Sequence, residues 1–169
     1  SLEYGTGVTS DSSGNIFVTG YTKGGLDGNT NSGGTDIFLV KFNSSGTKQW
    51  TKLLGTYLLE HGNGVTTDSS GNVYVTGDTD GGLDGNTSSG GRDIVLIKYN
   101  SSGTKQWTKL LGTSSYDEGK GVTTDSSGNI YVTGDTDGGL DGNTNSDPDS
   151  GTSGSDIFLV KYNSSGIKQ

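Results

Sequence analysis

The residues best suited to chemistry lie in two glycine-rich segments of identical sequence, 78–86 and 135–143. Each reads Asp-Thr-Asp-Gly-Gly-Leu-Asp-Gly-Asn, so carboxylate and amide oxygens recur along a supple backbone. Such oxygens suit a hard cation such as calcium, which takes about six to eight of them. Calcium is therefore the one cofactor that the sequence suggests. Its predicted ligands are Asp78, Asp80, Asp84, Asn86, Asp135, Asp137, Asp141 and Asn143.

A structural role is the alternative for these two segments. Their spacing departs from the EF-hand pattern, because no Glu follows at the bidentate position. In the corresponding segment of the first repeat, Tyr21 and Lys23 replace the two leading Asp residues, and Asp27 and Asn29 remain. Under this alternative, the Asp and Asn side chains form Asx turns that shape a long loop, and glycine supplies positive φ.

Residues for catalysis are scarce. His61 is the only histidine, and the positions 57 residues before and after it hold Tyr4 and Glu118. A Ser-His-Asp arrangement could therefore occur only once, and the sequence has no nucleophile motif to go with it. The chain has no Cys, which excludes disulfides and thiolate metal sites. Carboxylates abound, but no pair stands out as a glycosidase pair. We expect the chain not to be an enzyme.

The elements that position these residues recur every 57 residues: the segment 7–20 returns as 64–77 and as 121–134. An Asp-Ser-Ser-Gly-Asn tight turn joins the first two strands of each repeat, and the long loop leads to a third strand such as 156–162. This third strand has a run of apolar residues, which predicts burial on both faces. The first two repeats add a fourth strand, Lys-Gln-Trp-Thr-Lys-Leu-Leu.

These repeats predict an all-β fold, a β-propeller segment of three four-stranded antiparallel blades. One repeat domain would span 1–169, with blades at about 5–56, 62–113 and 119–169. The last strand of the third blade is missing, because the sequence ends where the earlier repeats continue into Trp. A β-trefoil, which also has three four-stranded repeats, is the alternative. A propeller ring typically has ~4–8 blades, so we expect further blades from the parent chain or from a homo-oligomer.

The strand and turn motifs resemble a known family. Gly-Val-Thr-Thr-Asp-Ser-Ser-Gly-Asn-Ile-Tyr-Val-Thr-Gly, Asp-Ile-Phe-Leu-Val-Lys-Tyr-Asn-Ser-Ser-Gly and Trp-Thr-Lys-Leu-Leu-Gly are similar to the bacterial seven-bladed β-propeller repeat, called SBBP. The resemblance covers nearly the whole chain. It implies a propeller from a secreted or cell-surface bacterial protein, usually one without an assigned activity. The expected location is therefore extracellular or at the bacterial cell surface.

The net charge limits the classes of possible binding partner, and the strand direction indicates which face would bind one. The net charge of −8 argues against nucleic acid, which needs a basic face. No apolar stretch approaches the ~20 residues of a membrane span, so we expect no membrane insertion. In an up-and-down blade the tight turns share one face, while the long loops and blade links share the other, which is the candidate ligand face. The predicted contact residues of this long-loop face are Tyr57, His61, Tyr116, Asp117 and Glu118.

Together these features predict a non-enzymatic binding or interaction scaffold, a propeller fragment of an exported or cell-surface protein. A protein or glycan partner would bind the long-loop face. One alternative is a carbohydrate-binding, lectin-like propeller, since repeated weak sites gain affinity through avidity. The other is a structural spacer with no ligand.

Overall fold

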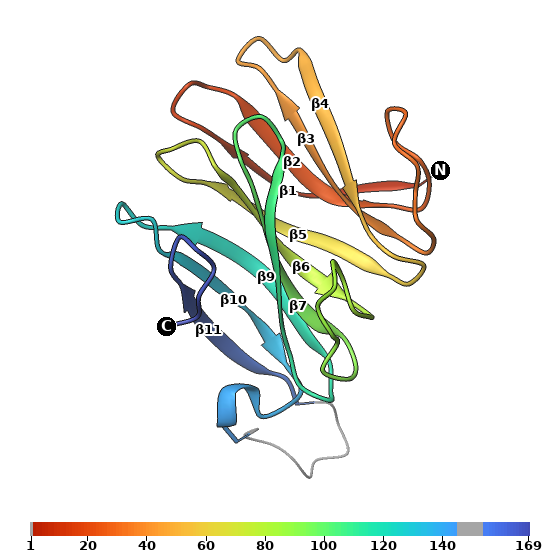
Figure 1. Cartoon of the computed structure of the whole chain (residues 1–169), viewed down its shortest axis with the longest axis vertical. Helices are drawn as coiled ribbons and strands as arrows, with labels where there is room; N and C mark the ends of the chain where they lie inside the picture. Colours follow the sequence, from red (N-terminus) through yellow and green to blue (C-terminus); the bar gives the residue numbers. More distant parts are fainter. Residues whose placement is uncertain (1, 145–153) are drawn as a thin grey trace.

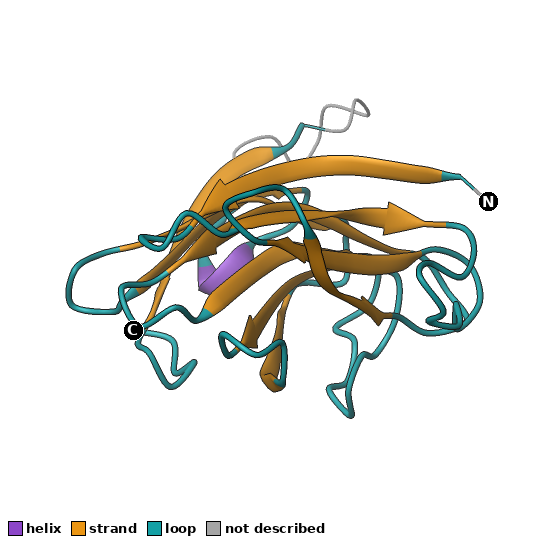
Figure 2. Ribbon diagram, turned by 90° about the horizontal axis from the view of Figure 1, so that it is seen from above, coloured by secondary structure: helices purple, strands orange, loops and turns teal. Residues whose placement is uncertain are grey.

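The computed structural model describes residues 2–144 and 154–169. The first sheet contains β1 (Glu3–Ser10), β2 (Ile16–Thr22), β3 (Asp36–Phe42) and β4 (Lys48–Leu54). The second contains β5 (Glu60–Thr67), β6 (Val73–Thr79), β7 (Asp93–Tyr99) and β8 (Lys105–Leu111). The third contains β9 (Asp117–Thr124), β10 (Ile130–Thr136) and β11 (Asp156–Tyr162). Strands dominate the described chain, together with one short 3-10 helix, η1 (Leu140–Gly142; Figure 2). No helix in the described residues is long and apolar enough to cross a membrane.

Each sheet is an antiparallel meander in which every strand pairs with its neighbours in sequence. The sheets pack face to face in chain order, and β5 lies between β1 and β9 (Figure 1). The first strands therefore form one edge of the array, and β4 and β8 are the last strands of their sheets. This arrangement confirms the predicted propeller segment. The β-trefoil alternative is wrong, because the three repeats form separate sheets that stack face to face.

The core consists of two apolar layers, one at each junction between blades. At the first junction Ile37 and Leu39 of β3 join a cluster with Val73, Val95 and other residues of the second blade. At the second junction Ile94 and Leu96 take the same positions against the third blade. Because alternate residues of a strand point to opposite faces, an inner blade is buried on both sides. The predicted double burial is confirmed for β3 and β7.

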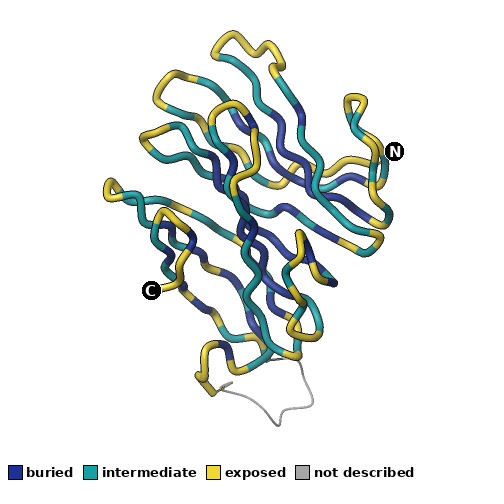
Figure 3. The backbone as a smooth tube through the Cα atoms, in the orientation of Figure 1, coloured by how far each residue is buried: buried dark blue, intermediate teal, exposed yellow. Residues whose placement is uncertain are grey.

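The third strand of the last blade differs from this pattern. Ile157 is 88% exposed and Leu159 72% exposed, whereas Phe158 and Val160 are buried against the second blade. No sheet of the described residues covers the face that carries Ile157 and Leu159 (Figure 3). In this structure β11 has a neighbouring blade on one face only, and the apolar residues on that face are the buried ones.

Tight turns close one end of every blade. Asp11 accepts hydrogen bonds from the backbone N–H groups of Ser13 and Asn15 and from the Asn15 amide, and Gly14 has a φ of 77°. Asp68 and Asp125 cap their turns in the same way. At the opposite end the long loop of the first blade lies against the following link, because Thr35 bridges Leu59. The predicted separation into a tight-turn face and a long-loop face is therefore present.

Candidate functional site

The side chains of the acidic segment 78–86 contact two different parts of the structure. Its trailing residues reach the outermost strand: Asp84 accepts a hydrogen bond from Thr108 Oγ1 at 2.5 Å and pairs with Lys105. Asn86 Nδ2 donates to the carbonyl oxygens of Leu83 at 2.9 Å and Thr108 at 3.3 Å. The second half of the segment therefore holds β8 against its own blade. We call this set of contacts the clamp.

The same clamp recurs in the neighbouring blades. Asp27 accepts a hydrogen bond from Thr51 at 2.6 Å and pairs with Lys48, and Asp141 pairs with Lys168. Asp27, Asp84 and Asp141 all have a positive φ, between 53° and 56°. Asp tolerates this left-handed backbone better than most residues do. A structural role for this part of the segment agrees with these contacts, although the Asp27 and Asp84 carboxylates bond to the neighbouring strand instead of forming the expected Asx turns.

The leading residues of the segment form a different cluster at the long-loop face. Asp78 is buried and lies 2.9 Å from His61 Nδ1 and 3.4 Å from Arg92 Nε. Arg92 also donates to Asp80 Oδ1 at 2.9 Å and to Glu118 Oε1 at 2.5 Å. We call these five residues, His61, Asp78, Asp80, Arg92 and Glu118, the Arg92 cluster. It joins the second blade to the first strand of the third.

The surroundings of Arg92 and Glu118 favour the charged form of each side chain. Burial disfavours the charged guanidinium, but its hydrogen bond to Asp80 and the negative charge of Asp78 outweigh burial and raise the pKa of Arg92 above its ordinary value. Burial likewise opposes ionisation of Glu118, yet contacts with Lys120 and Arg92 lower the pKa of that carboxyl below its usual range. The Arg92–Glu118 pair therefore favours the charged form of both of its members.

Sequence reasoning missed Arg92. It is the only arginine of the chain, and Thr35 and Ser155 stand before the third strand in the other two repeats. That departure from the repeat was the available signal. Its significance depends on Glu118, which lies 26 residues further along the chain and meets Arg92 only when the blades pack.

The predicted long-loop face residues differ in accessibility. Tyr57 is 79% exposed and Tyr116 60% exposed, with the Arg92 guanidinium 5.8 Å from the Tyr116 ring centroid. The His61 ring is half-buried and meets the Tyr21 ring edge-on. Glu118 is half-buried in the Arg92 cluster. These four residues lie on or close to the long-loop face.

Asp117, the fifth predicted contact residue, differs from these four because its side chain is fully buried. Its carboxylate accepts hydrogen bonds from the backbone N–H of Thr113 at 2.6 Å and from the hydroxyl of Thr136. It therefore caps the blade link from inside. Glu60 does the same for the preceding link, accepting from the Thr56 N–H at 2.8 Å and from the Thr79 hydroxyl.

Each of these capping carboxylates lies beside a second buried one at the start of a third strand. A Cβ added to Gly55 would lie 2.2 Å from Asp36 Oδ1 and 2.9 Å from Glu60 Oε2. Asp36 Oδ2 accepts from the Ser32 N–H, and Asp93 Oδ2 accepts from the Ser89 N–H. The Oδ1 atom of each has no hydrogen-bond partner.

Burial raises the pKa of Asp36 above its ordinary value. Burial also raises the pKa of Asp93, and the charge of Asp117 adds to that effect. Ionisation of these two carboxyls therefore opposes folding.

The predicted calcium ligands do not converge in one place. Asp135 stands opposite Glu118 and Ile157 in the ladder of β10, and Asp137 accepts a hydrogen bond from Ser155. Over residues 2–144 and 154–169, no group of three or more His, Cys, Asp or Glu side chains has a geometry that could hold a metal ion. Calcium binding stays a prediction, and any bound ion would have to compete with Lys105 for Asp84 and with Arg92 for Asp78 and Asp80.

The repeats match a known family of β-propeller repeats, and the chain is similar to parts of two longer proteins. The beta-propeller repeat SBBP matches residues 1–27, 49–84 and 106–141. An uncharacterized WD repeat-containing protein of Acanthamoeba polyphaga mimivirus, L264, is 30% identical over 79% of this chain. The regulatory protein FlaEY of Caulobacter vibrioides is 27% identical over 92% of it. The chain spans only 12% and 18% of the lengths of these two relatives.

Proposed function

We propose that this chain, which belongs to the SBBP beta-propeller repeat family, is a non-enzymatic scaffold that binds a protein partner through its long-loop face. The main support is the pair of exposed aromatic side chains, Tyr57 and Tyr116, on that face. Tyrosine and arginine are enriched among the residues that dominate binding energy in protein interfaces. The stacking of Arg92 on Tyr116 presents both types together.

The rigidity of the face also favours binding. Arg92 bridges the loop of the second blade and the first strand of the third, through Asp80 and Glu118. A surface that is already ordered loses less conformational entropy when a partner binds. The Arg92 cluster therefore suits a preorganised contact surface.

The relatives agree with a role in interactions. One is named as a WD repeat-containing protein and the other as a regulatory protein. We extend the proposal to an exported or cell-surface bacterial protein, on the strength of the family resemblance alone.

An enzymatic role has less support. His61 Nδ1 contacts Asp78, and His61 Nε2 lies 3.4 Å from Thr35 Oγ1, which superficially resembles a nucleophile-base-acid arrangement. Thr35 is only 2% exposed, so a substrate carbonyl could not approach its hydroxyl in this conformation. The arrangement fits a structural hydrogen bond between a loop and a blade link.

The glycan alternative requires equivalent aromatic sites in successive repeats. Tyr57 corresponds to Ser114 in the next link, and Tyr116 corresponds to Leu59 in the preceding one. The two tyrosines therefore do not form copies of one site. The spacer alternative predicts no ligand at all.

Selection from a phage-displayed peptide library tests the proposal. We expect enriched peptides to bind the wild-type chain and to bind a Tyr57→Ser/Tyr116→Ser variant at least about tenfold more weakly. Serine is the natural residue at the position that corresponds to Tyr57, so the links should tolerate it. Ser44→Ala, on the tight-turn face, is the matched control and should leave peptide binding unchanged.

Failure to enrich any peptide, or equal binding to the double variant, would contradict the proposal. A glycan array separates the lectin alternative: binding of glycans that is lost in the same double variant would favour it. Silence in both assays would favour the spacer.

A further inference from the structure

The sequence contains four Asn-X-Ser triplets, all without proline at the middle position. Three of them read Asn-Ser-Ser and begin at Asn43, Asn100 and Asn163, in the tight turn that follows the third strand of each blade. The fourth is Asn86-Thr87-Ser88, in the long loop of the second blade. Such triplets are the acceptor sequence for N-linked sugars, which attach at surface positions. The contacts of the four asparagine side chains divide them into two kinds.

Asn100 lies in the turn between β7 and β8, and its amide oxygen holds that turn together. Asn100 Oδ1 accepts hydrogen bonds from the Ser102 N–H at 3.1 Å, from the Ser102 hydroxyl at 2.7 Å and from the Thr104 N–H at 2.8 Å. Ser101 and Ser102 are exposed. Within the described residues the Nδ2 group of Asn100 donates no hydrogen bond. The turn therefore engages the amide oxygen and leaves the nitrogen that would carry a sugar.

The same arrangement is present in the other two turns. Asn43 Oδ1 accepts from the Ser45 hydroxyl at 2.8 Å and from two backbone N–H groups. Asn163 Oδ1 accepts from two backbone N–H groups at 3.0 Å. Neither Nδ2 group donates a hydrogen bond within the part of the chain that the structure describes. Hydrogen bonds accepted by an amide oxygen polarise the amide, which eases removal of a proton from its nitrogen.

The turn of Asn100 belongs to a blade that has a neighbour on each side. A Cβ at Gly103 would lie 3.0 Å from Trp50 Cε2, so the turn packs against β4 of the first blade. Toward the third blade, Lys98 Nζ of β7 donates to the Ser164 carbonyl oxygen at 3.0 Å. Asn100 is nevertheless only half-buried, and the two serines that follow it are exposed. Its accessibility is therefore compatible with the packing of adjacent blades.

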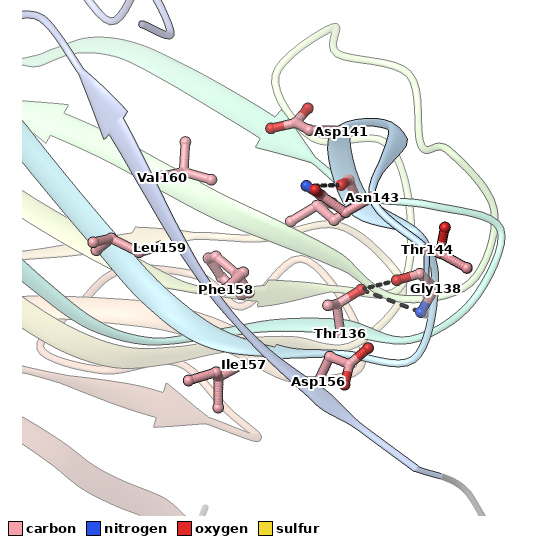
Figure 4. A pocket seen from close by; sticks show the side chains of 11 residues that line it. Thr136, Gly138, Asp141, Asn143, Thr144, Asp156, Ile157, Phe158, Leu159 and Val160 are labelled. Atoms are coloured by element: carbon pink, nitrogen blue, oxygen red, sulfur yellow. Dashed lines mark hydrogen bonds between the residues drawn. The ribbon is translucent and has the colours of Figure 1, made fainter. Parts of the chain in front are cut away.

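The long-loop asparagine differs from the turn residues, because its nitrogen is engaged. Asn86 Nδ2 donates to the carbonyl oxygens of Leu83 at 2.9 Å and Thr108 at 3.3 Å. Asn29 and Asn143 occupy this place in the other two blades and also donate to a leucine carbonyl three residues earlier; Figure 4 shows this bond for Asn143. Asn86 can react at Nδ2 only after both of its hydrogen bonds are broken.

We propose that Asn43, Asn100 and Asn163 are acceptor sites for N-linked glycosylation and that Asn86, despite its triplet, is not. The donor is a nucleoside-diphosphate sugar, used by a glycosyltransferase. In the reaction the asparagine Nδ2 attacks the anomeric carbon of the sugar, and a C–N bond forms as the bond from that carbon to the diphosphate oxygen breaks. The nucleoside diphosphate leaves with the electron pair of the broken bond, and a base of the transferase takes one Nδ2 proton.

The surroundings of the turns suit an attached sugar. A polar groove of about 420 Å³ lies between the tight turns of the second and third blades, beside Ser164. Its lining includes Ser69, Ser70, Ser127 and Lys98. Hydroxyl and ammonium groups of this kind can form hydrogen bonds with the hydroxyl groups of a sugar. All three acceptor turns lie on the tight-turn face, so a sugar there leaves the long-loop face free for the proposed partner.

Glycosylation of the folded 169-residue chain tests the proposal, with a purified transferase that recognises Asn-X-Ser and with UDP-glucose as the donor. Intact mass gives the number of hexoses added, and peptide mapping gives their positions. Synthetic peptides that contain each triplet correct for the sequence preference of the enzyme. We expect hexose on Asn43, Asn100 and Asn163. Relative to its own peptide, Asn86 should react at least about tenfold more slowly than the turn residues, because two hydrogen bonds must break first.

Substitutions within the triplets separate acceptor chemistry from folding. Ser102→Ala should abolish the hexose on Asn100 and leave those on Asn43 and Asn163, and Ser102→Thr should restore it, since threonine keeps the hydroxyl. Asn86→Gln is the matched control and should leave the number of hexoses unchanged. Absence of hexose from all three turns of the folded chain would overturn the proposal. Reaction of Asn86 in the folded chain at the rate of its peptide would overturn it as well.

Discussion

The Arg92 guanidinium donates from Nη1 to Glu118 Oε1 at 2.5 Å, across the junction between the second and third blades. Arg92 is the only arginine of the chain, and it also contacts Asp78 and Asp80 in its own blade. The Arg92–Glu118 pair therefore fixes the first strand of the third blade against the second blade at the long-loop face.

Replacement of Arg92 by Met should destabilise the fold. The change leaves Asp78 buried without its cationic neighbour and removes hydrogen bonds to two further carboxylates. We expect a loss of about 2 kcal/mol in the free energy of unfolding, measured by urea denaturation. Lys120→Met is the control: Lys120 also contacts Glu118, but it is exposed, so its loss should cost less than about 1 kcal/mol. Equal effects of the two variants would contradict a special role for Arg92.

Asp93→Asn should stabilise the protein at neutral pH. Burial and the charge of Asp117 raise the pKa of Asp93 above its unfolded value. A carboxyl with a raised pKa favours the fold while it is protonated, and that contribution is lost as pH rises through the folded pKa. The melting temperature of the variant should therefore exceed that of the wild type by an amount that grows from about pH 4 to pH 7.

Asp68→Asn should change the melting temperature in the opposite direction. Burial opposes ionisation of Asp68, but hydrogen bonds from Asn72 and Tyr74 outweigh it and lower the pKa of this carboxyl. Its contribution is present above the unfolded pKa and is lost as pH falls through the folded pKa. The Asp68→Asn variant should melt below the wild type at neutral pH, with a difference that shrinks in acid. Parallel pH profiles for the two variants would refute this assignment.

Gly77→Ala tests the close packing of β5 and β6. A Cβ at this position would lie 1.8 Å from the carbonyl oxygen of His61, so the backbone of the bulged ladder would have to move. We expect a loss of about 3 kcal/mol in urea denaturation. At Gly5, in β1, an added Cβ meets Val18 Cγ1 at an ordinary 3.9 Å. Gly5→Ala should change stability little, and an effect as large as that of Gly77→Ala would count against the steric explanation.

Calcium binding at the acidic segment of the second blade predicts a rise in melting temperature that EDTA reverses. Lys105 pairs with Asp84, so calcium would have to displace its ammonium group. Lys105→Met removes this competitor, and we expect the calcium-induced rise to be larger in the variant than in the wild type. Weak extracellular calcium sites bind at about 0.1–1 mM, which sets the range to scan. No rise in either protein would rule out the site.

The repeat made the fold predictable in unusual detail. The Asp-Ser-Ser-Gly-Asn turn depends on hydrogen bonds among residues close in sequence, such as Asp11 with Ser13 and Asn15, and local chemistry of this kind can be read directly. The exposure of Ile157 was not read from the sequence, since its apolar run is the same as that of a doubly buried strand.

The candidate site was less predictable. Asp78, Asp80 and Asp84 are neighbours in sequence, and that proximity suggested a single metal site. In the structure Asp78 and Asp80 instead contact Arg92, whereas Asp84 pairs with Lys105. Asp117 looked like a surface residue of a variable link, yet it turns inward to cap that link.

The sequence by itself determined the strands, the tight turns and the propeller class, because turn chemistry and apolar runs act over a few residues and are repeated in phase. Tertiary structure alone decided which charges meet. The contacts of Arg92 with Glu118 and of His61 with Asp78 join segments that approach only when sheets pair or pack, and burial there strengthens each interaction. The departures from the repeat mark where such contacts form, but only the packed blades identify their partners.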